Sequence, residues 1–226
     1  RIILRSMKIE KIIETSLDQN VTSFAGVPSW YLVLFKKVLE KTGKSNILEV
    51  WPNMEVFVHG GVNFEPYREQ YRKLFPSDQM HYVETYNASE GFFGIQDNLD
   101  RNDMLLMLDY GIYYEFIPKS DWENENPRVL SLEEVELDEN YAIVISTNAG
   151  LWRYIIGDTI KFTGKFPFKI KVTGRTKHFI NAFGEELIVD NSDAAIAEAA
   201  KIIENEFPED TERFPLSYIS GWLETH

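Results

Sequence analysis

The 226-residue sequence contains no cysteine, so it forms no disulfide bond and offers no thiolate to a metal ion. It also has no apolar run that approaches the roughly 18 residues of a membrane-spanning helix. No signal peptide is visible at its start. We therefore expect a cytoplasmic protein without a membrane partner, since a reducing compartment suits a chain without cysteine.

Positive charge is also scarce. The chain has 23 Lys and Arg against 36 Asp and Glu, a formal net charge of -13. Binding to nucleic-acid backbones relies on clustered basic residues, so we expect no nucleic-acid partner. Hydrophobic residues make up 44% and aromatic residues 14% of the chain, which indicates a globular protein rather than a disordered one.

The first third of the sequence alternates helical and strand-like patterns. Apolar residues at helical spacing predict a first helix with a buried stripe: Ile9, Ile12, Ile13 and Leu17. A second helix is expected between Pro28 and Gly43. A short buried strand over 55–61, a charged and exposed helix over 65–75 and a strand over 80–86 follow. This order predicts an α/β layer with parallel strands.

The middle of the chain changes character. Four short β-rich runs follow one another: 104–109, 112–118, 141–147 and 151–156. Turn-forming Asp-Tyr-Gly and Asn-Ala-Gly triplets separate some of these runs, which favours antiparallel strands in a meander or small barrel. A last helix is expected from about Asn191, a good N-cap residue.

The stretch "YNASEGFFG", from Tyr86 to Gly94, places a hydroxyl and a carboxylate beside aromatic rings at the end of an expected strand. Ligands bind at the carboxyl edge of α/β sheets, where Tyr86 is suited to a flat heterocycle. Ser89 could donate to a phosphate and Glu90 could bind Mg²⁺. Taken alone, the stretch better fits a polar β-turn with a solvated glutamate.

Three glycine-containing stretches also allow two readings. "HGG" after a strand lets a backbone approach a ligand closely, or is an ordinary turn, at Gly60 and Gly61. Gly157-Asp158 is a hairpin turn or presents a carboxylate to ribose hydroxyls. In 172–191, Arg175 contacts a nucleotide or is a surface charge, and its flanking glycines suit a hinge.

The order and spacing of these motifs carry more information than any one of them. Tyr-x-x-Ser-Glu-Gly, then Arg-x-x-x-Gly-Asp, then Gly-Arg-x-x-x-x-Ile-Asn resembles the adenylate-forming superfamily of acyl-CoA synthetases and luciferases. Within it, "GVPSWYLVLF", "VFVHGGVNFEPYREQYRKLF" and "LWRYIIGDTIKFTG" look most like the auxin-responsive (Gretchen Hagen type) acyl-acid amido synthetases. The cysteine-free, phenylalanine-rich version here resembles a bacterial member.

The resemblance implies an enzyme that uses ATP and Mg²⁺ to adenylate a small carboxylic acid, and then transfers the acyl group to an amino acid. The implied site residues fall into groups by role. Gly60, Gly61, Tyr86, Ser89, Asp158 and Arg175 would bind the nucleotide, Ser89 and Glu90 would be catalytic with Glu90 holding Mg²⁺, and Phe92 and Phe93 would line the acyl pocket.

The resemblance also implies the domain organisation. Residues 1–174 would be the later part of a large adenylate-forming domain, a mixed sheet with helices plus a small antiparallel β subdomain. Residues 175–226 would be the hinge and the start of a mobile C-terminal domain. The superfamily's phosphate loop and C-terminal lysine are not found here, so we expect a fragment that is inactive alone. We separately expect the protein to be a monomer. An acyl-CoA ligase and a non-catalytic nucleotide-binding fragment stay open as alternatives.

Overall fold

The computed structural model describes residues 2–176, 180–182 and 185–187. These residues belong to two compact units, one ending at Val83 and the other starting at Glu84. No helix among the described residues is long and apolar enough to cross a membrane. The expected helix from Asn191 lies outside the described residues.

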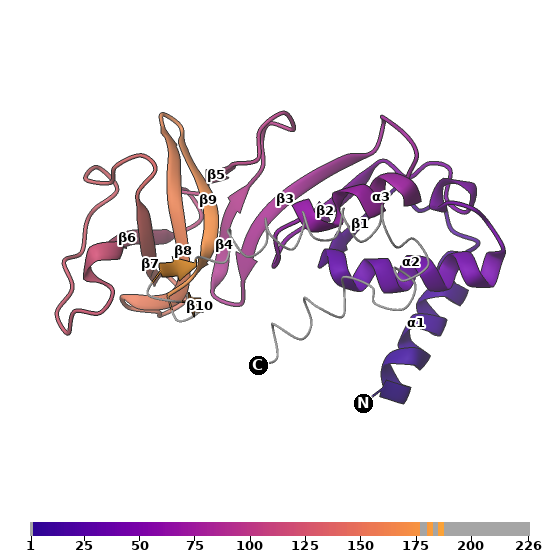
Figure 1. Ribbon diagram of the computed structural model, residues 1–226, viewed down its shortest axis with the longest axis horizontal. Helices are drawn as coiled ribbons and strands as arrows, with labels where there is room; N and C mark the ends of the chain where they lie inside the picture. Colours follow the sequence, from indigo (N-terminus) through magenta and orange to yellow (C-terminus); the bar gives the residue numbers. More distant parts are fainter. Residues whose placement is uncertain (1, 177–179, 183–184, 188–226) are drawn as a thin grey trace. The chain divides into compact units, whose positions relative to one another are not determined.

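The first unit consists of helices and a parallel strand pair (Figure 1). Its elements, in chain order, are α1 (Ile2–Ser16), β1 (Ser23–Gly26), α2 (Pro28–Thr42), β2 (Val56–His59) and α3 (Arg68–Leu74), with short 3-10 turns at Ile47–Glu49 and Glu65–Tyr67. Strand β1 pairs in parallel with β2, with Phe24 opposite Phe57.

Helix α2 has the ends that the sequence predicts. Pro28 occupies its first turn, where a missing N–H costs nothing. Gly43 follows its last residue with φ 67°, a left-handed conformation in which its N–H donates to the Leu39 carbonyl. The buried face includes Leu32 and Phe35, which turn toward the core of the unit.

Aromatic rings fill the core of the first unit. Phe57 stacks on Phe24 at 4.3 Å between ring centroids and on Tyr71 at 5.0 Å. The buried Tyr71 hydroxyl donates to the Pro28 carbonyl at 2.8 Å, which ties α3 to the start of α2. The segment over 65–75 is therefore not simply an exposed helix, because it buries Tyr71 and Phe75.

The expected stripe on the first helix is only partly correct. Ile13 is buried and joins the core of the first unit. Ile12, by contrast, is 49% exposed. Adjacent residues on a helix point about 100° apart around its axis. When Ile13 faces the core of the first unit, Ile12 therefore points to the side and is largely exposed.

The second unit is mostly antiparallel strand. Strand β3 (His81–Ala88) starts in the first unit and continues into the second. The others are β4 (Gly91–Ile95), β5 (Met104–Leu106), β6 (Ile112–Pro118), β7 (Asn140–Thr147), β8 (Tyr154–Lys165) and β9 (Phe168–Arg175), with a 3-10 turn at Lys119–Asp121 and a separate hairpin of β10 (Ile180–Ala182) and β11 (Glu185–Leu187).

The strand order in this unit is β3-β4-β5-β9-β8-β7-β6, and every described pair is antiparallel. Strands β8 and β9 form a long hairpin (Figure 1, orange). The core of the second unit includes Phe93, Phe116 and Phe162, which are completely buried, and Tyr86 belongs to the same cluster.

Parallel pairing in the first unit, antiparallel pairing in the second and the helices together make a mixed α/β fold, as predicted. Strand β3 continues through the turn at Ser89 and Glu90 into an antiparallel hairpin with β4. Of the two readings of Gly157-Asp158, the structure excludes the hairpin turn, because both residues lie inside β8. The boundary at residue 174 stays a prediction.

Candidate functional site

Asp158 is the centre of the candidate site. It lies in β8 directly opposite Arg175 of β9. The Arg175 Nε atom is 3.0 Å from Asp158 Oδ1, so the two side chains form an ion pair. The carboxylate is 20% exposed and the guanidinium 53% exposed, so both remain accessible to a ligand.

Tyr86 reaches the same carboxylate from β3. Its hydroxyl donates to Asp158 Oδ2 at 2.9 Å, and its ring, only 7% exposed, lies 4.9 Å from the Phe93 ring. Burial and then the Asp158 charge raise the pKa of the Tyr86 hydroxyl above its usual range. The hydroxyl is therefore protonated near pH 7 and donates the hydrogen bond to Asp158.

Arg175 is held by the backbone as well as by Asp158. Its Nη2 atom donates to the Ile156 carbonyl at 3.1 Å. Gly157 lies beneath it with φ 90°, and a Cβ atom there would be 3.4 Å from Arg175 Nη2. Glycine allows both this conformation and the close approach of the guanidinium. The N–H of Thr176 then donates to the Gly157 carbonyl at 2.8 Å.

An irregular register places these groups. The β8–β9 pairing shifts between Thr159 and Ile160, next to Asp158. The buried hydroxyls of Thr159 and Thr173 satisfy each other at 2.9 Å across this shift. Irregular pairing of this kind is common beside functional sites because it redirects side chains.

Ser89 and Glu90 form the turn between β3 and β4. Ser89 is exposed and Glu90 partly buried. Groups of three or more potential metal ligands are absent from the described residues. Mg²⁺ is commonly held by one or two carboxylates together with substrate phosphates, so the single carboxylate of Glu90 is compatible with this mode.

The two adjacent phenylalanines after the turn differ. Phe92 is partly buried, and its ring lies 5.9 Å from the exposed Tyr110 ring. Phe93 is completely buried and contributes to the core. Only Phe92 has an accessible surface, although the acyl-pocket role of both residues stays a prediction.

Gly60 and Gly61 belong to the first unit and follow β2. Gly61 has φ 84°, which suits glycine. The structure brings Tyr86, Asp158 and Arg175 together in the second unit, and the nucleotide role of the two glycines stays a prediction.

His59 and Arg153 have structural contacts of their own. His59 is 3% exposed and stacks on Phe64 at 4.2 Å. Burial, with the Arg68 charge next, lowers the pKa of His59 to about 4, so the ring is neutral near pH 7. Arg153 is exposed and pairs with Glu115 at 3.0 Å. It is an ion-pair partner at the surface.

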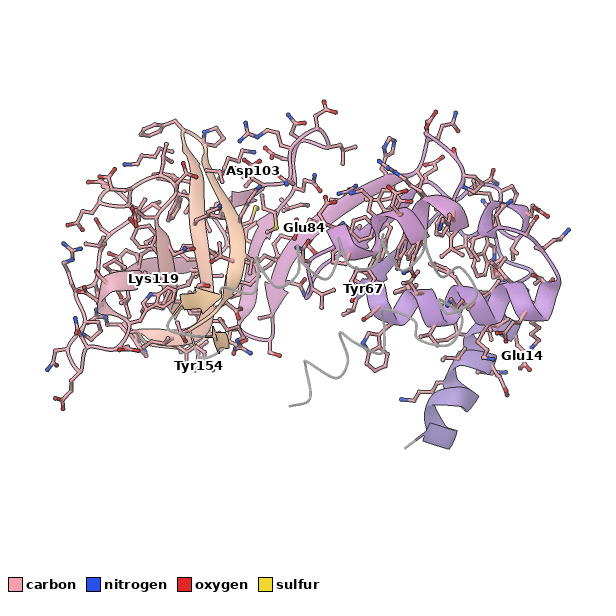
Figure 2. All side chains as sticks on the ribbon, viewed as in Figure 1. Glu14, Tyr67, Glu84, Asp103, Lys119 and Tyr154 are labelled. Atoms are coloured by element: carbon pink, nitrogen blue, oxygen red, sulfur yellow. The ribbon has the colours of Figure 1, made fainter. Side chains whose placement is uncertain are left out.

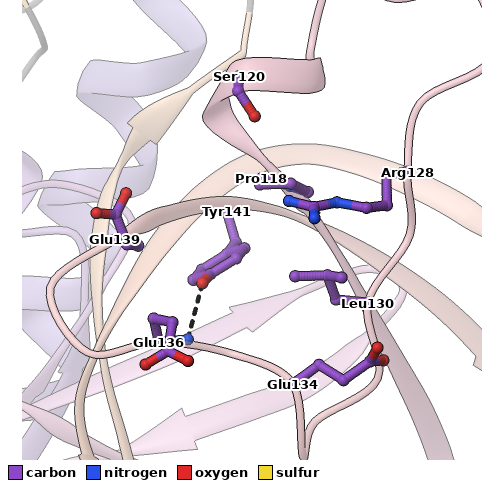
Figure 3. Close-up of a pocket in the computed structure, with 8 residues that line it drawn as sticks. All are labelled: Pro118, Ser120, Arg128, Leu130, Glu134, Glu136, Glu139 and Tyr141. Atoms are coloured by element: carbon purple, nitrogen blue, oxygen red, sulfur yellow. Dashed lines mark hydrogen bonds between the residues drawn. The ribbon is translucent and has the colours of Figure 1, made fainter.

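Sequence reasoning missed the pairing of Tyr86 with Asp158. The two residues are 72 positions apart in the chain, and no local pattern links them. It also missed an open pocket of about 470 Å³ at the surface of the second unit (Figure 3). Tyr141 lies within it and accepts a hydrogen bond from the Glu136 N–H at 2.8 Å. The pocket shares no residue with the Asp158 site.

Two segments of the chain match domains of one family. Residues 3–80 match the GH3 family N-terminal domain, and residues 105–175 match the GH3 family central domain. Together they cover about two thirds of the sequence. The two domains occur in the expected order, on either side of the Tyr86 motif.

Curated proteins that are similar in sequence to this chain include amido synthetases. An indole-3-acetic acid-amido synthetase, GH3.4 of Arabidopsis thaliana, is 29% identical over 94% of this chain and 38% of its own length. The jasmonoyl-L-amino acid synthetase JAR4 of Nicotiana attenuata is 32% identical over 52% of this chain and 21% of its own. The chain thus spans well under half of these relatives.

Solved structures share the fold. The GH3.15 acyl acid amido synthetase superposes with a TM-score of 0.68 at 17% identity, covering 91% of this chain and 46% of that one. A 2-hydroxyisobutyryl-CoA ligase superposes with a TM-score of 0.61 at 13% identity, covering 86% of this chain and 40% of that one. At this identity the likeness concerns the fold, which is that of adenylate-forming enzymes. The two domain matches and the amido synthetase relatives show that the chain belongs to the GH3 family.

Proposed function

We propose that the full-length protein containing this chain is an ATP-dependent acyl-acid amido synthetase. The observation that carries the proposal is the Asp158 site, in which a partly exposed carboxylate is oriented by Tyr86 and Arg175. Such a carboxylate can accept hydrogen bonds from the two hydroxyls of a ribose. The curated relatives named above are amido synthetases, which supports the same reaction for this protein.

The proposed reaction has two steps. In the first, a carboxylate oxygen of the acid attacks the α-phosphorus of ATP, the bond to the bridging oxygen breaks, and pyrophosphate leaves. In the second, an amino acid nitrogen attacks the acyl carbon, AMP leaves with the electron pair of the broken C–O bond, and the amine releases a proton to water. Both steps depend on positioning and on stabilisation of developing negative charge.

The residues of the β3–β4 turn are suited to the phosphates. The Ser89 hydroxyl is exposed and can donate to an α-phosphate oxygen. Glu90 would hold Mg²⁺ together with the triphosphate, and the ion would neutralise charge on the phosphate oxygens. We assign Gly60 and Gly61 to the adenine pocket, and Phe92 to the wall of the acid pocket with Phe93 behind it.

The adenine-stacking role expected for Tyr86 remains part of the proposal. The residue is only 7% exposed, so little of its surface is available to a base. The proposal also includes a bacterial origin, a cytoplasmic location and a monomeric state. It includes the two predicted segments, 1–174 and 175–226.

The test is pyrophosphate release by the full-length protein with ATP, Mg²⁺ and a panel of carboxylic acids, followed by mass spectrometry of the products with each amino acid. We expect acid-dependent release and an amide product. A parallel reaction that contains coenzyme A distinguishes the alternative: a coenzyme A thioester and no amide would identify an acyl-CoA ligase instead. Absence of both release and ATP binding would contradict the proposal.

A further inference from the structure

The contact between Tyr86 and Asp158 connects strands that are not neighbours in the sheet. Strands β4, β5 and β9 separate β3 from β8 in the strand order. The Tyr86 hydroxyl nevertheless lies 2.9 Å from Asp158 Oδ2. The hydrogen bond therefore runs across the interior of the second unit, where Tyr86 packs with the core.

We propose that Tyr86 is a positioning residue that orients the Asp158 carboxylate, so that the site prefers a ribonucleoside triphosphate to a deoxyribonucleoside triphosphate. This inference rests on the proposed function, because it assigns selectivity to the same nucleotide site. It concerns the hydroxyl of Tyr86 and is independent of any stacking by its ring.

The acceptor capacity of Asp158 supports this assignment. An ionised carboxylate has about four lone-pair sites, two on each oxygen. Tyr86 uses one site on Oδ2, and Arg175 Nε lies 3.0 Å from Oδ1. One site on each oxygen remains, which is the number that the two neighbouring hydroxyls of a ribose require. A deoxyribose supplies only one of these donors and leaves one acceptor to water.

The orientation of the Asp158 carboxylate depends on two donors, the Tyr86 hydroxyl and the Arg175 guanidinium. Arg175 is anchored by its second bond to the Ile156 carbonyl, and so fixes the Oδ1 side. Tyr86 is anchored by its buried ring beside Phe93, and so fixes the Oδ2 side. Without the Tyr86 hydroxyl, Arg175 alone restrains the carboxylate, which can then turn further about its Cβ–Cγ bond. Its vacant acceptors are then no longer held toward both ribose hydroxyls.

The test compares ATP, 2′-deoxyATP and 3′-deoxyATP as ligands of the full-length protein by isothermal titration calorimetry. We expect wild type to bind ATP more tightly than either deoxy analogue. In Tyr86→Phe we expect ATP to bind about tenfold more weakly and the deoxy analogues to lose much less, so that the preference largely disappears. Asp158→Asn should lose the preference too, and the double variant should lose little more than Asp158→Asn alone.

Tyr114→Phe is the matched control. Tyr114 is a buried tyrosine of the same core, and its hydroxyl donates to the Met107 carbonyl at 3.0 Å. The control should keep the wild-type preference, which separates a loss of orientation from a general loss of core packing.

A Tyr86→Phe variant that folds and still prefers ATP as strongly as wild type would overturn the inference while leaving the proposed function intact. A wild-type protein that binds none of the three nucleotides would overturn the proposed function itself.

Discussion

The two candidate carboxylates, Asp158 and Glu90, differ in the number of side-chain contacts that hold them in place. Asp158 has two side-chain partners within the second unit, Tyr86 and Arg175. Glu90, by contrast, lies in the turn between β3 and β4 and is partly exposed. A carboxylate of this kind gains most of its interaction energy from the ligand, so its contribution should be visible in catalysis rather than in folding.

We therefore expect Glu90→Gln to leave the fold intact and to lower kcat for pyrophosphate release about 100-fold, because the amide has no charge to hold Mg²⁺. The Mg²⁺ concentration needed for half-maximal rate should rise in the same variant. A Mg²⁺ titration of the initial rate measures both effects. Glu133→Gln, at an exposed glutamate of the same unit, is the control and should match wild type. An unchanged Mg²⁺ requirement in Glu90→Gln would remove Glu90 from the proposed metal site.

At the scale of elements, a buried carboxylate fixes the loop before β5. Asp103, labelled in Figure 2, is 3% exposed. It forms a two-pronged ion pair with Arg101. It also accepts a hydrogen bond from Thr163 of β8 at 2.8 Å, although β9 lies between β5 and β8 in the strand order. One side chain thus joins the loop to the long hairpin.

Hydrogen bonding from Arg101 holds the pKa of Asp103 below its usual range. A depressed carboxyl pKa stabilises the folded state at pH values above the unfolded pKa of about 4, and the gain is lost as pH falls through the folded pKa. We expect Asp103→Asn to lower the free energy of unfolding by about 1–2 kcal/mol at pH 7. The difference from wild type should shrink below about pH 4.

Urea denaturation of both proteins at pH 7, 5 and 3 measures this difference. Asp100→Asn, in the same loop but exposed, should unfold like wild type at every pH. A difference between wild type and Asp103→Asn that stays constant from pH 7 to pH 3 would mean that the charge of Asp103 is not what stabilises the loop.

The elements were predictable where local chemistry determines them. Pro28 and Gly43 mark the ends of α2 because each residue type has a backbone preference that no neighbour needs to supply. Gly157-Asp158 was open between two readings because the dipeptide is common in turns. Pairing with β9 across a register shift places it inside a strand, and only the folded structure contains that pairing.

The sequence named three of the candidate site residues together, but it did not predict their geometry, and their role in binding stays a prediction. The motif order indicated Tyr86, Asp158 and Arg175 together, and the structure brings these three side chains into contact. The direct bond from Tyr86 to Asp158 depends on how β3 and β8 face each other across a core, which sequence spacing does not encode. The same limit explains why Phe92 and Phe93, adjacent in sequence, differ so much in burial.

At the scale of the whole molecule, the two units have separate hydrophobic cores. One core is centred on the rings around Phe57, and the other contains Phe93, Phe116 and Phe162. Each core is formed by side chains from its own unit. A cavity in one core should therefore weaken that unit first.

We expect Phe57→Ala to cost about 3–5 kcal/mol in the first unit. Hydrogen exchange followed by mass spectrometry should show faster exchange in peptides from residues 23–75, with little change in peptides from residues 104–175. The reciprocal variant Phe116→Ala should give the opposite pattern. Equal acceleration in both sets of peptides for either variant would show that the two units unfold as one.

Strand β8 carries Asp158 within two residues of Ile156 and Ile160, which are buried in the core of the second unit. A substitution that shifts the carboxylate therefore disturbs the core. Phe92 and Tyr110 contact each other near the surface, where the fold tolerates change. Under the proposed function, a directed-evolution library aimed at new acids would therefore best begin at Phe92 and its neighbour Tyr110, and would leave β8 unaltered.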